Sequence, residues 1–165
     1  MLDQNTIDTT VKAALLEDAP TGDITSLLAI TEDATATAVL AAREEGTFAG
    51  ADVFEAAFRL TDPRITVELL KQDGDRFVPG DELARVSGPA RGILTGERIG
   101  LNFTQRMSGI ATLTSKYVDA VAGTNATILD TRKTTPNLRA FERHAVVCGG
   151  GTNHRLNLST AFMAK

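Results

Sequence analysis

The sequence has no tryptophan, one tyrosine and one cysteine among its 165 residues. A single cysteine excludes a disulfide bond within the chain and is typical of proteins from a reducing compartment, so we expect a cytoplasmic location. No apolar run approaches the roughly 20 residues that a membrane-spanning helix needs. The first ten residues lack a basic region followed by an apolar stretch, so we expect no secretory signal peptide.

The chain holds 42% hydrophobic and 23% charged residues, which is ordinary for a soluble globular protein with a buried core. The two histidines, the cysteine and the carboxylates show no metal-ligand spacing, so we expect no metal site in this sequence. No serine, histidine and aspartate arrangement indicates a catalytic triad. We expect Cys148 to be a small buried residue and His144 to lie packed on its helix.

Positive charge is scarce in most of the chain and is concentrated near its end. Residues 126–165 contain six lysines or arginines and two acidic residues, a net charge of +4, whereas residues 1–125 carry −8. A cationic segment on an acidic body indicates an anionic partner. Nucleic acid is disfavoured, because this segment has no array of aromatic residues for stacking on bases. A small polyanionic substrate fits the charge distribution better.

The first part of the chain is predicted to combine helices with antiparallel strands. Apolar residues at helical spacing predict a first helix, with Asn5 as its cap, and a loop rich in Pro, Gly and Asp follows it. Alternating β-branched residues and glycine–proline turns predict the strands. The expected helices cover 5–17 and 50–60, and the expected strands cover 34–44, 64–70 and two short runs within 73–88.

Residues 90–121 have the apolar spacing of a long helical region. Ser108 and Gly109 interrupt that pattern, so we expect two helices with a break between them. Next, "ATILD" (126–130) is a short apolar run followed at once by charged and hydroxyl residues. Such a run is typical of a buried parallel strand that delivers residues to a site at its carboxyl end. Two further elements are expected, a helix over 138–147 and an apolar element over 156–165.

This layout predicts an α+β N-terminal domain over residues 1–103, with a hammerhead-like antiparallel sheet and helices. Residues 104–165 are expected to form the first units of an incomplete α/β barrel. One β–α unit cannot form a sheet, because a barrel closes with eight such units. We therefore expect the sequence to be the front portion of a longer protein and to be inactive by itself.

Two motifs in the basic segment carry candidate binding residues. In "TRKTTP", Arg132 and Lys133 follow Thr131 on a loop; an arginine fork binds carboxylate or phosphate, and a lysine adds a point charge. The alternative for this motif is a solvated basic turn. In "CGGGTNHR", three glycines permit a close approach of the backbone, and His154 and Arg155 offer donors that suit a carboxylate. This motif is not a P-loop, because the lysine-hydroxyl ending is missing.

Together these motifs resemble those of the quinolinate phosphoribosyltransferase family, also called nicotinate-nucleotide pyrophosphorylase (carboxylating). The resemblance covers nearly the whole chain, in order. It is carried by the segments "LLEDAPTGDITS", "DPRITVELLKQDGDRFVPGDELARVSGPARGILTGERIGLNF", "MSGIATLTSKYVDAV", "ILDTRKTTPNLR" and "CGGGTNHRLNL". The resemblance implies a pentosyltransferase of de novo NAD synthesis. It would transfer the phosphoribosyl group of phosphoribosyl pyrophosphate to quinolinate with loss of CO2, giving nicotinate mononucleotide and pyrophosphate.

The resemblance also implies roles for individual residues. The dicarboxylate quinolinate would be bound by Arg132, His154, Arg155 and Lys165. Lys133 would lie near the phosphoribosyl donor, with Thr131 supporting the same loop, and Lys133 and Lys165 would be the catalytic pair. Arg98 would reach the site from the partner subunit of a homodimer. Mg²⁺ would accompany the donor, held by residues beyond this sequence.

One segment departs from the family pattern. Where "KYAVRC" is common, this chain has "RHAVVC" (143–148), so that His144 replaces an aromatic residue and Val147 replaces a basic one. Two alternatives therefore stay open. One is a relative encoded with molybdate transport genes, which shares this fold and much of the motif set. The other is a non-catalytic anion-binding module that retains only this part of the enzyme.

Overall fold

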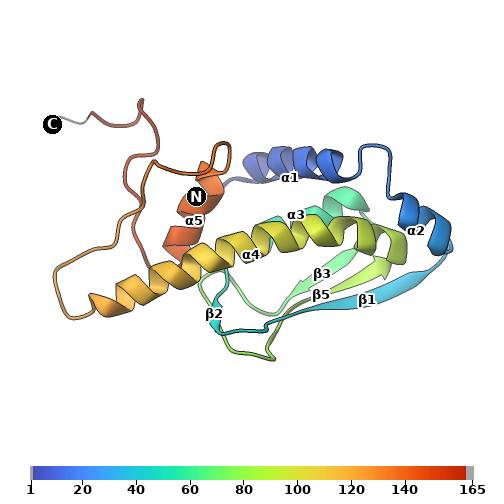
Figure 1. Cartoon of the computed structure of the whole chain (residues 1–165), viewed down its shortest axis with the longest axis horizontal. Helices are drawn as coiled ribbons and strands as arrows, with labels where there is room; N and C mark the ends of the chain where they lie inside the picture. Colours follow the sequence, from blue (N-terminus) through green and yellow to red (C-terminus); the bar gives the residue numbers. More distant parts are fainter. Residues whose placement is uncertain (1, 163–165) are drawn as a thin grey trace.

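The structure is a computed structural model that describes residues 2–162. Its longest element is α4 (Ala90–Ala120), which runs through the molecule from the antiparallel sheet to the loops near the C-terminal end (Figure 1). At 31 residues and 1.5 Å per residue, α4 is about 46 Å long. Every other part of the described chain is arranged along this helix.

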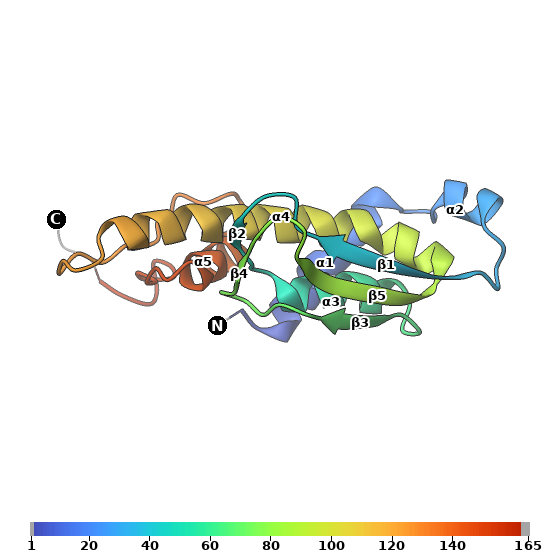
Figure 2. The same ribbon diagram turned by 90° about the horizontal axis from the view of Figure 1, so that it is seen from below.

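A three-stranded antiparallel sheet lies along the first half of α4 (Figure 2). Its strands stand in the order β1 (Thr35–Ala41), β5 (Glu82–Pro89), β3 (Thr66–Leu69). Two short strands, β2 (Gly46–Thr47) and β4 (Arg76–Phe77), form a separate antiparallel pair. The central strand β5 alternates buried and exposed residues, so that Ala84 and Val86 face the helices.

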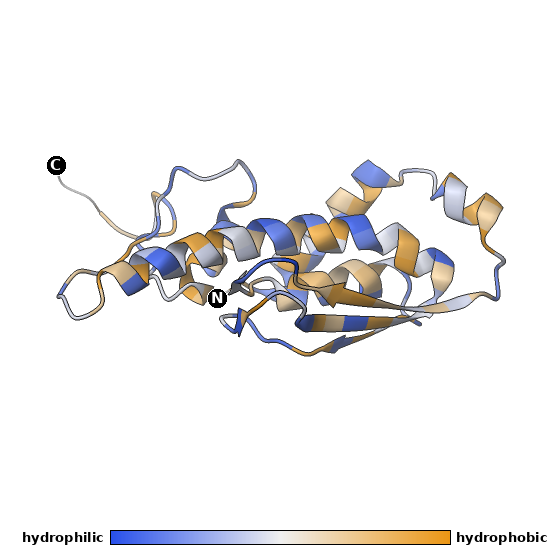
Figure 3. Ribbon diagram, turned by 60° about the horizontal axis from the view of Figure 1, so that its bottom comes forward, coloured by the Kyte–Doolittle hydropathy of each residue, from blue (hydrophilic) through white to orange (hydrophobic). Residues whose placement is uncertain are grey.

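Two helices, α1 (Gln4–Asp18) and α3 (Ala51–Thr61), pack against each other and against α4. Apolar residues of these three helices and of α5 (Arg139–Cys148) share one core, in which Val11, Ala57 and Met107 are almost fully buried. Figure 3 shows hydrophobic and hydrophilic residues alternating along α4, as expected for a helix with one buried face. The core is therefore continuous from the sheet to the C-terminal segments.

The start of the chain differs from the prediction in two places. The cap of α1 is Asp3 rather than Asn5, because the Asp3 carboxylate accepts a 2.9 Å hydrogen bond from the Thr6 backbone N–H. The end of the predicted loop is also helical, since Asp23 caps a short helix, α2 (Ile24–Ala29), through the Ser26 N–H. Capping by an aspartate outweighs the glycine and proline that precede it.

The predicted break at Ser108 and Gly109 is wrong, because α4 is one continuous helix through both residues. Contacts with residues distant in the sequence keep this stretch helical. The Ser108 hydroxyl accepts a hydrogen bond from the Ala49 N–H at 3.1 Å and donates to the Ala49 carbonyl at 3.3 Å. Met107 and Ala111 are buried on either side. Burying a methionine side chain alone stabilises by about 1.5–3 kcal/mol, which exceeds the roughly 1 kcal/mol cost of one helical glycine.

Beyond α4, the expected strand over 126–130 is reduced to a single parallel bridge between Leu129 and Thr152. The α5 helix, between these two positions, matches the predicted helix over 138–147 closely. In the described part of the apolar element predicted over 156–165, residues 157–160 form a bend and a turn, and no helix or strand is present. The predicted division between residues 103 and 104 falls inside α4 and stays a prediction. In the described part of the chain, none of the helices has the length and apolar character needed to cross a bilayer.

Candidate functional site

The two basic motifs meet where residues 128–130 and 152–154 run in parallel. The Asp130 N–H donates to the Thr152 carbonyl at 3.0 Å, and the Thr152 N–H donates to the Ile128 carbonyl at 2.8 Å. The α5 helix is the crossover between the two segments. Because parallel segments have their carboxyl ends at the same edge, the residues that follow them emerge side by side. Those residues are Thr131–Lys133 on one segment and His154–Arg155 on the other.

A buried ion pair fixes the two segments to each other. Arg143 on α5 bonds the Asp130 carboxylate at 2.7 Å, and the two side chains are only 8% and 2% exposed. Arg143 also donates to the carbonyl of His154 at 2.7 Å and to that of Arg155 at 3.1 Å. Asp130 accepts the His154 N–H at 2.9 Å. The guanidinium and the carboxylate therefore satisfy each other and determine where the backbone of the second motif runs.

The Asn153 side chain joins the same network. With its amide nitrogen turned toward the acceptors, it donates to the Arg143 carbonyl at 3.0 Å and to the Asp130 carboxylate at 2.7 Å. Sequence reasoning placed Asp130 at the end of a strand but gave Arg143 and Asn153 no role. Arg143 is buried on α5 with Phe141 and Ala145, whereas Val147, four residues further along, is 48% exposed, so the sequence offered no signal for it. Spacing alone cannot show that an arginine turns inward.

The loop that carries Arg132 and Lys133 is held from both ends. The Lys133 N–H donates to the Thr131 hydroxyl at 3.1 Å, and Arg139 donates to the Thr134 hydroxyl at 3.1 Å. Near the end of this loop, Arg106 of α4 binds the Thr135 hydroxyl. The loop is therefore pinned to both α4 and α5.

Glu142 is the second anchor of this loop. It accepts the Thr135 N–H at 3.2 Å and forms an ion pair with Arg106. Burial acts to raise the pKa of the Glu142 carboxyl, but the hydrogen bonds from Arg106 and Thr135 outweigh it and hold the pKa below its usual value. Glu142 is thus kept as a carboxylate that orders the loop.

Four of the predicted binding residues differ in how much they face the solvent. Lys133 and His154 are exposed, whereas Arg132 and Arg155 are half-buried. Arg155 donates to the Ala161 carbonyl at 3.2 Å. The Nε atom of Arg132 is buried and has no hydrogen-bond partner among residues 2–162. A buried donor of this kind needs an acceptor, and an anionic group is the natural one.

The glycines of "CGGGTNHR" bring the chain close to α4 rather than to a ligand. A Cβ atom at Gly149 would lie 2.4 Å from the Ala111 carbonyl oxygen of α4. Gly150 has a φ of +84°, a backbone conformation that other residues rarely adopt. At Gly151 a Cβ would lie 2.7 Å from the Val146 side chain. The triplet thus seats the end of α5 against α4, and His154 and Arg155 emerge beyond it.

Two predicted site residues do not join this cluster within the described chain. Arg98 lies on α4, and its side chain is 73% exposed, with Nε 3.7 Å from the Asp18 carboxylate. Arg98 lies eight residues, about 12 Å along α4, before Arg106, the residue that binds the Thr135 hydroxyl of the basic loop. Arg98 borders a recess of about 320 Å³ on an open face of α4. Lys165 lies outside the described residues.

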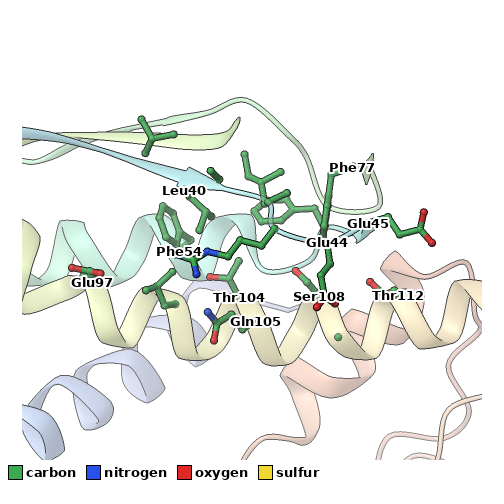
Figure 4. A pocket seen from close by; sticks show the side chains of 18 of the residues that line it. Leu40, Glu44, Glu45, Phe54, Phe77, Glu97, Thr104, Gln105, Ser108 and Thr112 are labelled. Atoms are coloured by element: carbon green, nitrogen blue, oxygen red, sulfur yellow. The ribbon is translucent and has the colours of Figure 1, made fainter. Parts of the chain in front are cut away.

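A groove with a volume of about 970 Å³ lies elsewhere, between β1 and α4. Figure 4 shows Leu40, Phe54 and Phe77 along this groove, with Gln105 of α4 at its base. None of the predicted binding residues from 98 to 155 lines it. The predicted binding residues are therefore separate from this groove.

Comparison with known proteins identifies relatives over almost the whole chain. The family model for the N-terminal domain of quinolinate phosphoribosyl transferase matches residues 23–108, and that for its C-terminal domain matches residues 110–165. A chloroplastic nicotinate-nucleotide pyrophosphorylase (carboxylating) of Arabidopsis thaliana is 45% identical over 156 residues, covering 94% of this chain and 44% of its own. The Mycobacterium leprae protein of that name is 43% identical over 161 residues, covering 94% and 56%.

A solved structure supports the same assignment. The crystal structure of NadC from Streptococcus pyogenes superimposes with a TM-score of 0.92 at 44% identity, covering 96% of this chain and 56% of that one. This similarity confirms the predicted fold class, an α+β domain with a small antiparallel sheet followed by the start of an α/β barrel. The chain spans about half the length of the curated relatives that it matches.

Proposed function

Because the chain belongs to the quinolinate phosphoribosyltransferase family, we propose that it forms part of an enzyme that makes nicotinate mononucleotide. In this reaction the phosphoribosyl group of phosphoribosyl pyrophosphate passes to quinolinate, and pyrophosphate and CO2 leave. The observation that carries the proposal is the meeting of the "TRKTT" and "GGGTNHR" motifs at the carboxyl ends of two parallel segments. An edge of this kind is where α/β barrels bind their substrates.

The proposed quinolinate site uses Arg132, His154, Arg155 and Lys165. The buried Nε of Arg132, which has no partner among residues 2–162, supports this assignment, because a guanidinium fork binds a carboxylate through two parallel hydrogen bonds. His154 and Arg155 are supported by their position, since the Asp130–Arg143 pair fixes their backbone beside the Arg132 loop. Lys165 is included by motif match alone.

Lys133 and Thr131 are proposed to serve the phosphoribosyl donor. Lys133 is exposed on the loop, and the Thr131 hydroxyl fixes the backbone of Lys133. The ribosyl transition state resembles an oxocarbenium ion, and the free lone pair of the pyridine nitrogen attacks it, so no strong base is required. The enzyme contributes positioning and preorganised positive charge, to which Lys133 and Lys165 would add.

Loss of CO2 follows the transfer. The electron pair of the breaking carbon–carboxylate bond stays on the ring carbon, where the adjacent pyridinium nitrogen stabilises it, and that carbon then takes up a proton. An arginine at that carboxylate must orient it without stabilising its charge too strongly, because the charge disappears in the transition state. Arg132 and Arg155 are the candidates for this role.

Mg²⁺ is proposed to accompany phosphoribosyl pyrophosphate. The described residues beside the basic motifs do not fit a Mg²⁺ site. Asp130 is committed to Arg143, and Glu142 is committed to Arg106 and Thr135. Mg²⁺ prefers carboxylates that are free to coordinate it in near-octahedral geometry. No step of the reaction is therefore assigned to the metal through these side chains.

A homodimer is proposed because the family resemblance gives Arg98 to the site of a partner subunit, and the Arg98 side chain is 73% exposed on α4 beside Asp18. The open face of α4 around Arg98 includes Leu94, which is 46% exposed. An exposed arginine beside apolar surface is typical of residues at protein interfaces. In such a dimer Arg98 would complete the partner's quinolinate site. A cytoplasmic location stays a prediction from the composition.

The direct test is turnover of quinolinate and phosphoribosyl pyrophosphate by the complete protein, measured as equimolar nicotinate mononucleotide and CO2. Replacing Arg132 by lysine keeps the charge but removes the fork. Since a hydrogen bond to a charged group is worth about 1.5–3 kcal/mol, we expect R132K to lower kcat/KM for quinolinate by about 10–100-fold. Arg76→Lys is the matched control, because Arg76 pairs with Asp119 on the exposed surface.

Two outcomes would contradict the proposal. One is an R132K enzyme with the kcat/KM of the unchanged protein. The other is calorimetric binding of quinolinate without any dependence on phosphoribosyl pyrophosphate and without turnover, which would instead indicate a non-catalytic anion-binding module.

A further inference from the structure

Three different metal-ligating side chains meet between the sheet and α5. Asp73, His144 and Cys148 each offer one ligand atom, an oxygen, a nitrogen and a sulfur, and these atoms all lie within 4.8 Å of one another. His144 and Cys148 are four residues apart on α5, so both project from the same face of the helix. Asp73 comes from the turn between β3 and β4. The sequence separation of more than 70 residues hid this group from the analysis of spacing.

Asp73 is held firmly in place by the backbone. One of its carboxylate oxygens accepts the N–H groups of Gly50 at 2.7 Å and of Ala51 at 2.9 Å, at the start of α3. The other oxygen lies 2.5 Å from Nε2 of His144. Burial acts to raise the pKa of Asp73, but these hydrogen bonds outweigh it and keep the pKa below its usual value. One carboxylate oxygen is thus committed to α3, while the other faces His144 and Cys148.

We propose that Asp73, His144 and Cys148 form a binding site for a borderline-soft divalent cation, with Zn²⁺ as its best-matched occupant. Zinc is bound by cysteine sulfur, histidine nitrogen and carboxylate oxygen, and three protein ligands plus water complete its tetrahedron. A thiolate and an imidazole select zinc over Mg²⁺, which prefers oxygen ligands alone. The site goes beyond the proposed activity, since none of its three residues is assigned to either substrate.

The geometry requires only a small adjustment to hold the ion. Two nitrogen or oxygen ligands about 2.0–2.2 Å from a tetrahedral zinc lie about 3.4 Å apart, and His144 and Asp73 start at 2.5 Å. A side-chain rotation that moves these two ligand atoms about 1 Å further apart therefore opens room for the ion. The side chains of His144 and Asp73 are each 24% exposed, which leaves a path from solvent.

Binding of Zn²⁺ to the Cys148 sulfur releases one proton. In the metal-free protein, burial, with the Asp73 charge adding to it, raises the pKa of the Cys148 thiol to about 12, so the sulfur carries its proton. Zinc forms a bond to the sulfur, and the thiol proton passes to solvent. The hydrogen bond between His144 and Asp73 is replaced by one bond from each residue to the metal. The resulting bridge joins the β3–β4 turn to α5, whose Arg143 positions the second basic motif.

The test is titration of the purified protein with Zn²⁺, Co²⁺ and Mg²⁺. Bound Co²⁺ gives a thiolate charge-transfer absorption that reports directly on a cysteine ligand, and Cys148 is the only cysteine in this sequence. We expect one Co²⁺ per chain with this absorption, its displacement by Zn²⁺, and no response to Mg²⁺. Losing an outer-shell partner already lowers metal affinity by about 10–100-fold, so losing a ligand in C148S or H144Q should cost at least as much.

His154→Gln is the matched control, since His154 is the only other histidine in the sequence. It should bind Co²⁺ and Zn²⁺ like the unchanged protein. Far-UV circular dichroism and the melting temperature confirm that each variant is folded. Absence of the charge-transfer absorption in the unchanged protein would overturn the proposal, as would zinc affinity that is unaffected in folded C148S. Loss of binding in H154Q but not in H144Q would assign the metal to the other motif and would equally overturn it.

Discussion

At the scale of single residues, the glycines of the "CGGGTNHR" motif act through their lack of a side chain. Three glycines in sequence indicate a close approach, but they do not say to what. In the structure the close approach is to α4, because a Cβ atom at Gly149 would lie nearest to the Ala111 carbonyl oxygen. A motif that borders a binding site can thus owe its composition to the support of that site.

Gly149→Ala should destabilise the protein, because the new Cβ would lie 2.4 Å from the Ala111 oxygen and would push α5 away from α4. We expect a loss of about 1–3 kcal/mol in the free energy of unfolding, measured by urea denaturation. Gly109→Ala is the matched control, since a Cβ there meets nothing within 4 Å and the residue is helical. It should gain about 0.5–1 kcal/mol. Equal effects of the two substitutions would show that contact with α4 is not the cause.

At the scale of elements, the buried pair of Asp130 and Arg143 connects a strand end to a helix. Each member is almost fully enclosed, and each also bonds the backbone of the second basic motif. Removing one partner leaves an uncompensated charge in the interior, which costs far more than the pair itself contributes. The stability of this β–α unit therefore depends on the presence of both members of the pair.

Arg143→Met should lower the free energy of unfolding by about 3–5 kcal/mol, because Asp130 would be left buried and unpaired. Arg76→Met provides the comparison, since Arg76 and Asp119 are 65% and 56% exposed. An exposed pair contributes about 0–1 kcal/mol, so its loss should be small. The measurement is chemical denaturation of both variants in the same buffer. Similar losses in R143M and R76M would contradict the role given to burial.

Sequence reasoning predicted the elements with local signals and failed where tertiary contacts decide. The helices over 50–60 and 138–147 follow from their apolar spacing, and the structure has them within one or two residues. The break at Ser108 was wrong because bonds to Ala49, 59 residues away, hold the helix straight. The motifs predicted the site residues, whose roles stay predictions, but their buried supports, such as Arg143, have no local signature.

At the scale of the whole molecule, the proposal that Arg98 completes the site of a partner subunit makes a strong prediction about assembly. If each site combines Arg132 of its own chain with Arg98 of the partner subunit, R98A damages the partner's site and R132A damages the site of its own chain. The two variants can therefore complement each other. In a mixed dimer one site receives both alterations, and the other receives neither. Symmetric pairing of this kind follows from the two-fold axis of a dimer.

Mixing the inactive R98A and R132A proteins under conditions that exchange subunits should restore about a quarter of the unchanged activity, because about half of randomly paired dimers are mixed and each has one intact site. The measurement is nicotinate mononucleotide formation before and after exchange. The double variant R98A/R132A, mixed with itself, should stay inactive. No recovery in a mixture shown to have exchanged would indicate that Arg98 serves its own chain or neither.

Because α4 is one continuous helix, it is a rigid connection between the elements that pack along it. Its first half contacts the sheet and carries Arg98, its middle holds the loop of Arg132 through Arg106, and its second half supports α5. A rigid rod that tilts by about 5° at Arg98 moves Arg106, about 12 Å further along it, by about 1 Å. Displacements of about 1 Å at a reacting centre can change rates by about a hundredfold. In the proposed dimer, the stiffness of this one helix therefore links the seating of a neighbouring subunit at Arg98 to the position of the loop that carries Arg132 and Lys133.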